Sequence, residues 1–349
     1  MKLLTAAARD LPPAYFALVM ATGIISIAAH MLGLHLVGRA LLYLNGVFYA
    51  VLWLLNGLRL TWFTRRMLAD MTDAARGPGY FTWIAATSVL GGQCVAIEYA
   101  YWVATALFVL ASLLWLGLSY TVLASLAIRS DKSTLASGIN GGWLLIVVAT
   151  QSIAVLAADI GAHWPQPFRL DLNFLALAMW LAGGMLYVWV STLIFYRYFF
   201  FELVPADLMP TYWIDMGATA ISTLAGSLLI TNSAHAPYLH SVRPFLEGMT
   251  VFYWAVGSWW IPLLLLLGFW QHVIRRVPLV YNPLYWGLVF PLGMYAAATE
   301  HMSRSMKLSF LWFIPDIFFC LALLAWGITL FGLLRHMAVA GKSAARGPS

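Results

Sequence analysis

Small polar residues recur near the middle of alternate apolar segments of this chain. Hydroxyl, amide and bare backbone groups at that depth can donate hydrogen bonds to a partly dehydrated solute while adding almost no formal charge. Such a lining suits an anion or a neutral solute, which it binds weakly and releases. The residues expected to line a pore are Thr22, Gly23, Ser26, Ser88, Gly91, Gly92, Thr150, Gln151, Thr219, Ser222, Thr223 and Gly293.

Each of these residues has an ordinary alternative role. Glycine, serine and threonine also let neighbouring membrane helices approach closely, and any one of them is better explained that way. Agreement between separate segments at one depth is harder to explain by packing alone. The pattern as a whole therefore favours a pore.

A phenylalanine occupies the same depth in the ninth apolar segment. Phe290 follows Asn282 by eight residues, which at 1.5 Å per residue puts it about 12 Å into the membrane. Pro291 removes one backbone hydrogen bond and can bend the helix, leaving room for the ring to project inward. A rigid apolar ring there would close a pore, whereas the ordinary alternative is a ring packed against neighbouring helices.

Ionisable residues inside a membrane are functional candidates by default. Asp215 lies about one turn inside the seventh segment and Asp316 about two turns inside the tenth, so both are possible proton-coupling carboxylates. Either could equally be a buried polar group with a structural partner. The remaining carboxylates of the segments lie at their ends, where water reaches them, and a structural role is expected there: Glu98, Asp159, Glu247 and Glu300.

The histidine and cysteine spacings predict no metal site, no cofactor and no enzyme. His30 and His35, like His235 and His240, are five residues apart, which does not place two ligands on one helix face. The two cysteines lie in different apolar segments and provide neither a disulfide framework nor a metal site. No nucleotide-binding or hydrolase motif occurs in a suitable context.

Ten membrane-spanning helices are needed to position these residues. The chain has 349 residues, of which 62% are hydrophobic and only 9% charged, and its mean hydropathy is +0.84. Ordinary soluble domains carry about 25% charged residues, so this is an integral membrane protein. The expected spans are 12–34, 40–63, 80–97, 99–127, 140–159, 173–200, 211–231, 243–273, 282–303 and 309–337.

The ten spans alternate in character. The odd spans are shorter and richer in small and polar residues, and the even spans are richer in leucine and aromatic residues. Two concentric layers would produce this contrast, because lipid favours bulky apolar side chains. We therefore expect an all-α integral membrane fold of five helical hairpins around a central pore, with odd helices inside and even helices outside. Quasi-fivefold symmetry would follow, although no repeat is apparent in the residues.

The basic residues predict the orientation. With the N-terminus inside, fourteen lysines and arginines fall on the inner side and five on the outer side. This bias places both termini in the cytoplasm and explains the net charge of +6 without a nucleic-acid partner. Residues 1–337 are expected to form one transmembrane domain, and residues 338–349 a disordered basic tail.

Two stretches carry a family resemblance. LPPAYFALVMATGIISIAAH, from Leu11 to His30, and YNPLYWGLVFPLGMYAAAT, from Tyr281 to Thr299, resemble the tellurite-resistance/dicarboxylate transporter family. That family includes tellurite-resistance protein A, fungal malate permeases and sulfite pumps, and plant slow anion channels. The resemblance implies a five-hairpin bundle with one pore per subunit, commonly in a homotrimer. It also implies that the phenylalanine of a W-x-x-x-F-P stretch, here Phe290, blocks the pore.

The expected function is passage of small anions through a phenylalanine-gated pore in each subunit. The alternative is a proton-coupled secondary carrier or exporter of C4-dicarboxylates such as malate, of sulfite or of tellurite-type oxyanions. A carrier needs two gates and usually a coupling site, so an essential Asp215 or Asp316 would favour it. The expected partners are small inorganic or organic anions, membrane lipid and two further copies of the chain, in a bacterial inner or plasma membrane.

Overall fold

The chain is built from helices. The computed structural model describes residues 2–345, and no strand occurs within them. The predicted all-α class is thereby confirmed, and the apolar helices make this a multi-pass membrane protein. The long helices are α2 (Ala17–Met31), α3 (His35–Trp62), α5 (Phe81–Glu98), α6 (Tyr101–Ile128), α8 (Leu145–His163), α9 (Phe168–Phe200), α10 (Ile214–Asn232), α12 (Arg243–Phe269), α13 (Trp286–Met306) and α14 (Phe313–Ala345).

Shorter helices connect or begin the long ones. They include α1 (Lys2–Asp10), α4 (Thr64–Met71), α7 (Leu135–Gly138) and α11 (Pro237–Ser241). A π-turn, η7 (Trp270–Ile274), continues α12. The 3₁₀ turns are η1 (Pro13–Phe16), η2 (Gly77–Tyr80), η3 (Gly141–Leu144), η4 (Pro205–Asp207), η5 (Pro210–Trp213), η6 (Ser233–His235), η8 (Pro283–Tyr285) and η9 (Ser309–Leu311).

The long helices pack as consecutive pairs: α2 on α3, α5 on α6, α8 on α9, α10 on α12, and α13 on α14. Tight turns set up several of these pairs. Gly33 joins α2 to α3 with a φ of 83°, a backbone conformation in which glycine carries no steric penalty. Tyr99 and Lys307 turn the chain at the corresponding places after α5 and α13, with φ of 53° and 57°. Short connections of this kind make the paired helices antiparallel.

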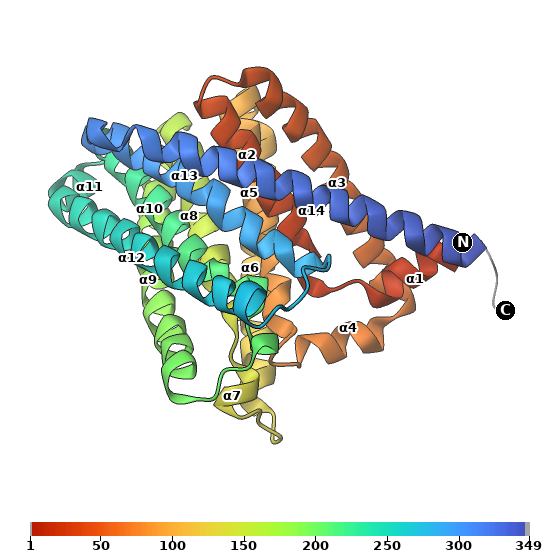
Figure 1. Ribbon diagram of the computed structural model, residues 1–349. Helices are drawn as coiled ribbons and strands as arrows, with labels where there is room; N and C mark the ends of the chain where they lie inside the picture. The colour runs from red at the N-terminus through yellow and green to blue at the C-terminus, as the bar shows by residue number, and fades with distance from the viewer. Residues whose placement is uncertain (1, 346–349) are drawn as a thin grey trace.

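Five of the long helices form a closed inner ring, and the other five long helices lie outside it. In Figure 1, the outer helix α14 crosses in front of the inner helix α13. Around the ring, α2 contacts α5, α5 contacts α8, α8 contacts α10, α10 contacts α13, and α13 contacts α2. In α2, α5, α8 and α10 with their starting turns, 72% to 94% of the most apolar stretch is buried, against 22% to 39% in α3, α6, α9, α12 and α14. The layering predicted from the odd and even spans is therefore present in the structure.

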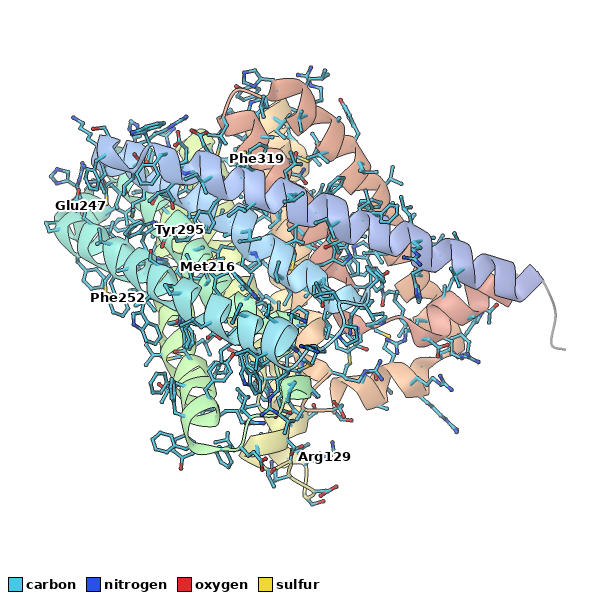
Figure 2. The ribbon with its side chains drawn as sticks, in the orientation of Figure 1. Arg129, Met216, Glu247, Phe252, Tyr295 and Phe319 are labelled. Carbon is cyan, nitrogen blue, oxygen red and sulfur yellow. The ribbon has the colours of Figure 1, made fainter. Side chains whose placement is uncertain are left out.

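Large apolar side chains cover the outside of the outer layer. Phe252 on α12 is 46% exposed, whereas Tyr295 on the inner helix α13 is only 3% exposed (Figure 2). Lipid is as apolar as leucine or phenylalanine, so such exposure costs nothing in a bilayer. The outer layer thus has the composition of a lipid-facing surface.

Helix α13 differs from the sequence expectation. Nine helices in the described part of the chain are long and apolar enough to cross a membrane, and α13 is not one of them. Glu300, His301 and Arg304 lie in its last two turns and lower its hydropathy. The helix nevertheless completes the inner ring, because it contacts both α2 and α10. Ten crossings of the membrane remain a prediction.

Each inner helix begins with a 3₁₀ turn, and these turns form a second closed ring. In order, η1, η2, η3, η5 and η8 each contact their two neighbours. Two of the contacts require glycine. A Cβ atom at Gly79 would lie 2.9 Å from the backbone nitrogen of Ala14, and one at Gly141 would overlap the backbone carbonyl of Thr211. We call the five turns the turn ring.

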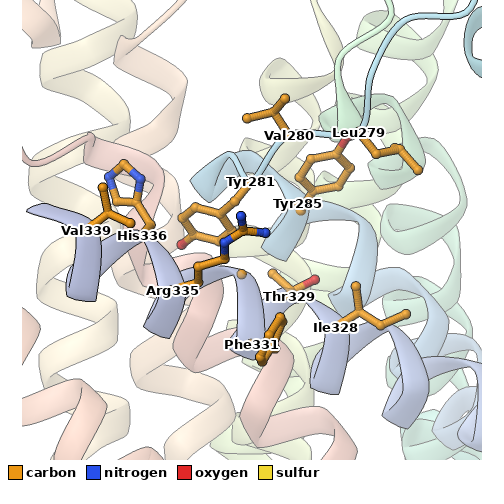
Figure 3. A pocket seen from close by; sticks show the side chains of 11 residues that line it. Leu279, Val280, Tyr281, Tyr285, Ile328, Thr329, Phe331, Arg335, His336 and Val339 are labelled. Atoms are coloured by element: carbon orange, nitrogen blue, oxygen red, sulfur yellow. The ribbon is translucent and has the colours of Figure 1, made fainter.

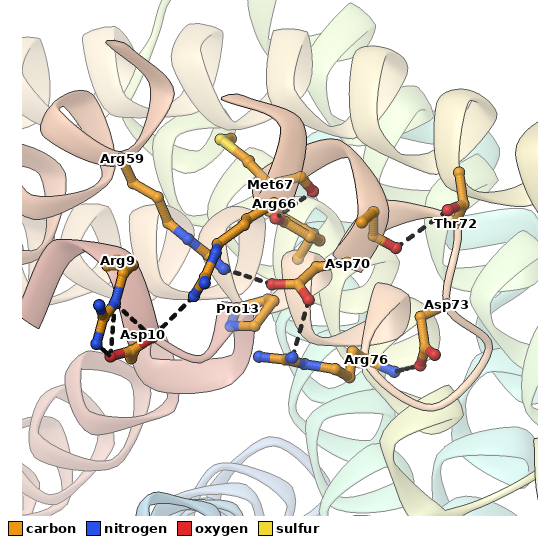
Figure 4. Close-up of polar contacts among 12 residues, drawn as sticks. Arg9, Asp10, Pro13, Arg59, Arg66, Met67, Asp70, Thr72, Asp73 and Arg76 are labelled. Atoms are coloured by element: carbon orange, nitrogen blue, oxygen red, sulfur yellow. Dashed lines mark hydrogen bonds and ion pairs between the residues drawn. The ribbon is translucent and has the colours of Figure 1, made fainter. Parts of the chain in front are cut away.

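A buried ion-pair cluster anchors η2 in the turn ring (Figure 4). Arg59 on α3 donates to Asp70 on α4 at 2.5 Å, and Arg76, directly before η2, lies 3.0 Å from the other oxygen of Asp70. The Arg59 side chain is only 2% exposed. Tyr80 within η2 donates to the backbone oxygen of Met67 on α4 at 3.0 Å. The cluster thereby ties α3 and α4 to the start of an inner helix.

Two further groups of ion pairs lie near the turn ring. Beside the Arg59 cluster, the hydrogen bond from Arg9 holds the pKa of Asp10 below its ordinary value. Before η5, the half-buried pair of Arg197 and Asp207 is 2.8 Å apart, and Arg197 also donates to the backbone oxygens of Ala136 and Glu202. These contacts fix the segments of chain that lead into η1 and η5.

Helix α14 extends into the segment predicted to be a disordered tail. The disordered tail was predicted to begin at residue 338, but α14 continues to Ala345. Four of the eight residues from 338 to 345 are alanine, the best helix former, and an existing helix extends at little cost. Residues 346–349 lie outside the described part of the chain.

Candidate functional site

A small cavity lies inside the turn ring, and Phe290 lies at its wall. The cavity has a volume of about 10 Å³, close to the smallest that admits one water molecule. Every inner helix contributes to it within its first turns. The lining residues are Ala14, Ala17, Met20, Thr82, Leu145, Thr211, Ile214, Leu284, Gly287 and Phe290. We call this space the inner cavity.

A larger cavity lies farther along the same five helices. It has a volume of about 220 Å³, and its polar lining includes Ser88, Ser152, Asp159 and His301. The Ser88 hydroxyl has no hydrogen-bond partner among the described residues. We call this space the outer cavity, because it lies toward the ends of the inner helices that are remote from the turn ring.

Phe290 lies where the two cavities come closest. On α13 the inner cavity reaches Phe290 and the outer cavity reaches Met294, and on α2 the corresponding residues are Met20 and Ile24. Four residues of helix separate each pair, a rise of about 6 Å. Phe290 is 1% exposed, and the cavity residues nearest to it in these helices are apolar. Along α2 and α13, apolar residues therefore lie between the two cavities.

Pro291 fits into the adjacent inner helix. A Cβ atom at Gly217 of α10 would lie 2.8 Å from Cγ of Pro291. Glycine at this place lets the proline ring seat closely against α10 and fixes the part of α13 that carries Phe290.

The structure gives most of the predicted pore-lining residues a different environment. Ser88 and Gly92 line the outer cavity. The others do not belong to the lining of either cavity and face neighbouring helices instead. For example, Ser26 donates to the backbone oxygen of Gly38 on α3, and Gln151 donates to that of Trp180 on α9. A role in lining a pore stays a prediction for these residues: Thr22, Gly23, Ser26, Gly91, Thr150, Gln151, Thr219, Ser222, Thr223 and Gly293.

The glycines and hydroxyls among these residues serve helix packing. A Cβ atom at Gly23 would meet Val89 of α5, one at Gly91 would meet Leu156 of α8, and one at Gly293 would meet Ile24 of α2. Ser222 and Thr223 donate to backbone oxygens of their own helix, as does Thr219, which also lies against Gly257 of α12. Their small size, rather than their polarity, explains their position.

Each inner helix makes a hydrogen bond with a tryptophan or tyrosine side chain of the outer layer. In every case the donor lies on the outer helix of one hairpin and the acceptor on the inner helix of the next. The regular pattern is a fivefold repeat of the connection between layers. The pairs are Trp326 with Thr22, Tyr49 with Thr87, Trp115 with Thr150, Trp180 with the Ser222 carbonyl, and Trp254 with Thr299, all at 2.8 to 3.0 Å.

The two predicted coupling carboxylates do not line either cavity. Asp215 is fully buried, and neither carboxylate oxygen has a hydrogen-bond partner among the described residues. It interacts electrostatically with Tyr187 and Tyr198 of α9, which places it between the two layers. Asp316 is exposed on the outer helix α14. Proton coupling by Asp215 or Asp316 stays a prediction.

Asp159 and His301 are the ionisable residues that line the outer cavity. The sequence placed Asp159 at a segment end and gave no reason to pair it with a residue on α13. A carboxylate and an imidazole in one enclosed space can both exchange protons with a solute. Contact information between α8 and α13 would be needed to predict this pair.

The sequence does contain a signal for the turn ring, at the starts of the inner helices. A proline or glycine is followed, after one residue, by tyrosine or tryptophan and then by a large apolar residue. The proline locks φ at a helical value and lacks the N–H group that a first turn leaves unpaired. The five copies are Pro13-Ala14-Tyr15-Phe16, Pro78-Gly79-Tyr80-Phe81, Gly141-Gly142-Trp143-Leu144, Pro210-Thr211-Tyr212-Trp213 and Pro283-Leu284-Tyr285-Trp286.

A cavity of about 570 Å³ lies outside the ring, between α14 and residues 279–285 (Figure 3). Its wall is mostly apolar and includes exposed residues of α14 such as Phe331 and Arg335. The inner helices do not contribute their cavity-lining side chains to it, and it is not part of the path between them.

Comparison with known proteins agrees with this architecture. A family model described as a voltage-dependent anion channel, SLAC1, matches residues 10–334. Two uncharacterized transporters of Methanocaldococcus jannaschii are 24% and 22% identical to this chain over 341 and 332 residues; each alignment covers 92% of this chain, and 92% and 93% of the two relatives. An uncharacterized membrane protein of Mycobacterium tuberculosis is 40% identical over 153 residues, which cover 44% of this chain and 77% of that protein.

Proposed function

Because this chain belongs to the SLAC1 family of voltage-dependent anion channels, we propose that small anions pass through its inner ring and that Phe290 gates the passage. Membership in an anion channel and transporter family confirms the resemblance found in the sequence. The single observation that supports the gate is the position of Phe290 between the two cavities. Both cavities are lined by residues of all five inner helices, so an axial path would run through both.

The lining is suited to anions rather than to metal cations. The inner cavity is lined, among the described residues, by uncharged groups only. The N-terminal ends of all five inner helices meet at the turn ring, and each carries a partial positive charge of about half an elementary charge. An entering cation would be repelled there, and an anion attracted.

We expect reconstituted protein to conduct chloride far better than sodium or potassium. In liposomes under a salt gradient, the reversal potential should lie close to the chloride equilibrium value. Protein-free liposomes provide the control for leak. A reversal potential near the cation equilibrium value would contradict the proposed path.

A proton-coupled carrier is the second candidate, and the outer cavity favours it. Asp159 and His301 could bind a proton in the same space as a solute. The same liposomes separate the two candidates: a channel passes anions without a pH gradient, whereas a carrier shows uptake driven by an imposed pH gradient. Malate, sulfite and tellurite are the solutes to compare with chloride.

The proposal includes the orientation of the protein in the membrane and its oligomeric state. We propose that the turn ring faces the cytoplasm of a bacterial cell, with both termini on that side. The basic residues Arg59, Arg76 and Arg197 lie around this end of the bundle, in agreement with the preference for positive charge inside. We also propose a homotrimer with one path per subunit, on the basis of the resemblance of the two sequence stretches to the family.

A further inference from the structure

A groove on the outside of the bundle combines an apolar wall with basic side chains. It is the cavity of about 570 Å³ between α14 and residues 279–285, and we call it the α14 groove (Figure 3). Its apolar wall includes Ile328 and Phe331, which are 65% and 68% exposed. Arg335 and His336 follow on the same helix and also line the groove. Such a lining suits a molecule with an apolar part and a negative charge.

The positive charge of Arg335 is not neutralised within the subunit. Among the described residues, the ion pairs involve other arginines, and Arg335 takes part in none of them. The described residues that line the groove include no aspartate or glutamate. Arginine keeps its charge at physiological pH, and its planar group of N–H donors fits a phosphate. The charge of the groove is therefore complementary to a phosphate-bearing ligand.

The basic residues of the groove lie at the depth of lipid headgroups. Because α14 begins at Phe313, a rise of 1.5 Å per residue puts Ile328 about 22 Å and Arg335 about 33 Å along the helix. The hydrocarbon layer of a bilayer is about 30 Å thick. Helix α14 ends on the side of the turn ring, since its antiparallel partner α13 begins there. Arg335 is therefore level with the headgroups of that leaflet, while Ile328 lies at the depth of acyl chains.

The wall of the groove opposite α14 belongs to the turn ring. Tyr285 lies within η8, and the hydroxyl of Tyr281, just before it, is 3.1 Å from the hydroxyl of Tyr15 in η1. A Cβ atom at Gly332 of α14 would lie 2.9 Å from the Tyr281 ring, and the His336 ring centroid is 5.7 Å from that of Tyr281. A molecule in the groove would therefore contact both α14 and the turn that begins α13.

A phospholipid has the phosphate and the apolar chain in one molecule. A free inorganic anion would leave the apolar wall uncovered, and a neutral lipid would leave Arg335 without a counter-charge. In a zwitterionic phospholipid, the amine of the headgroup already balances the phosphate. Basic pockets between membrane helices accordingly select anionic headgroups.

We propose that the α14 groove binds one anionic phospholipid. Its phosphate accepts hydrogen bonds from Arg335 and His336, and one acyl chain lies along Ile328 and Phe331. The site goes beyond the proposed anion path, because it lies outside the inner ring and none of its contacts involves Phe290 or the two cavities. The bound lipid joins α14 to η8, so it stabilises the folded protein.

Thermal unfolding in detergent tests the site without requiring any transport. Phosphatidylglycerol should raise the melting temperature of the wild type more than phosphatidylcholine with the same acyl chains. Arg335→Gln should raise the phosphatidylglycerol concentration for half-maximal stabilisation by about fivefold, as expected for one basic residue at the membrane surface. Arg65→Gln is the matched control. Arg65 lies on α4, on the side of the turn ring, and is likewise exposed and without an ion pair among the described residues.

A second pair of variants tests the apolar part of the site. Phe331→Ala removes contact with the acyl chain and should weaken the stabilisation by phosphatidylglycerol. Phe310→Ala is the matched control, because Phe310 and Phe331 are both 68% exposed but Phe310 lies in η9, before α14. Native mass spectrometry should find one phosphatidylglycerol retained per wild-type subunit and none in Arg335→Gln.

Three outcomes would overturn the site. Equal stabilisation of the wild type by the two lipids would show that the groove does not select an anionic headgroup. Equal weakening by Arg335→Gln and Arg65→Gln would show that lipid responds only to the overall charge of the protein. A second copy of the chain seated in the groove would give fewer subunits per assembly for Phe331→Ala, with the lipid preference unchanged.

Discussion

Phe290→Ala should raise the anion conductance per folded subunit, and Phe290→Leu should give an intermediate value. The ring is 1% exposed and stands at the short apolar barrier between the two cavities. Its removal would widen the barrier and let water enter a previously dry constriction. If the ring accounts for only about 1.4 kcal/mol of the barrier, conductance rises about tenfold.

A purely structural role of Phe290 gives the opposite result. Truncation of a packed phenylalanine leaves a void and costs about 3–5 kcal/mol, so the folded yield and the melting temperature would fall while the conductance per folded subunit would not rise. Phe319→Ala provides a matched control, since Phe319 is 5% exposed but lies on α14, outside the ring. That variant should lose stability without gaining conductance. Liposome conductance, normalised to folded protein, and melting temperature should be measured for all three variants.

Asp70→Asn should destabilise the protein by about 3–5 kcal/mol. The substitution leaves the Arg59 guanidinium, which is 2% exposed, without its counter-charge, and it also breaks the ion pair of Arg76, which directly precedes η2. Asp131→Asn is the matched control, because Asp131 is 92% exposed and 3.8 Å from its partner Arg129. An exposed pair of this kind contributes about 1 kcal/mol or less. Equal melting temperatures for the two variants would show that the Arg59 cluster does not support the turn ring.

The sequence was sufficient to predict the two layers of helices. The small residues of the odd spans and the bulky residues of the even spans reflect contact with other helices and contact with lipid, which the structure confirms through burial. Helix geometry also predicted a depth of about 12 Å for Phe290, and its role as a gate stays a prediction. Periodicity and the average burial of a helix depend on neighbouring residues in the sequence, so a single sequence is enough to predict them.

The contacts of the small polar residues could not be predicted in the same way. A threonine that accepts a hydrogen bond from an outer helix, such as Thr22 from Trp326, has the same sequence pattern as one that faces a pore. Only the contacts between distant segments distinguish the two. Likewise, nothing in the sequence connects Asp159 with His301, because the ring that brings them to one cavity is closed by helices far apart in the chain.

The turn ring differs from these contacts, because the sequence itself contains a signal for it. The repeat of its five turns is visible in the sequence, but it spans only four residues at the edges of much longer apolar segments. A comparison of whole spans does not reveal this four-residue repeat. Packing within the membrane places few constraints on the order of the apolar residues, so the rest of each span differs. The structural reason for the repeat becomes clear once the five turns are seen to contact one another.

A charged thiol reagent applied to Phe290→Cys tests most directly whether anions pass this residue. Cys94 and Cys320 are first replaced by alanine, so that the introduced cysteine is the only target. We expect a conducting variant whose conductance is lost on attachment of a sulfonate-bearing methanethiosulfonate and restored by a reducing agent. Complete labelling, verified by mass spectrometry, with unchanged conductance would place the anion path elsewhere.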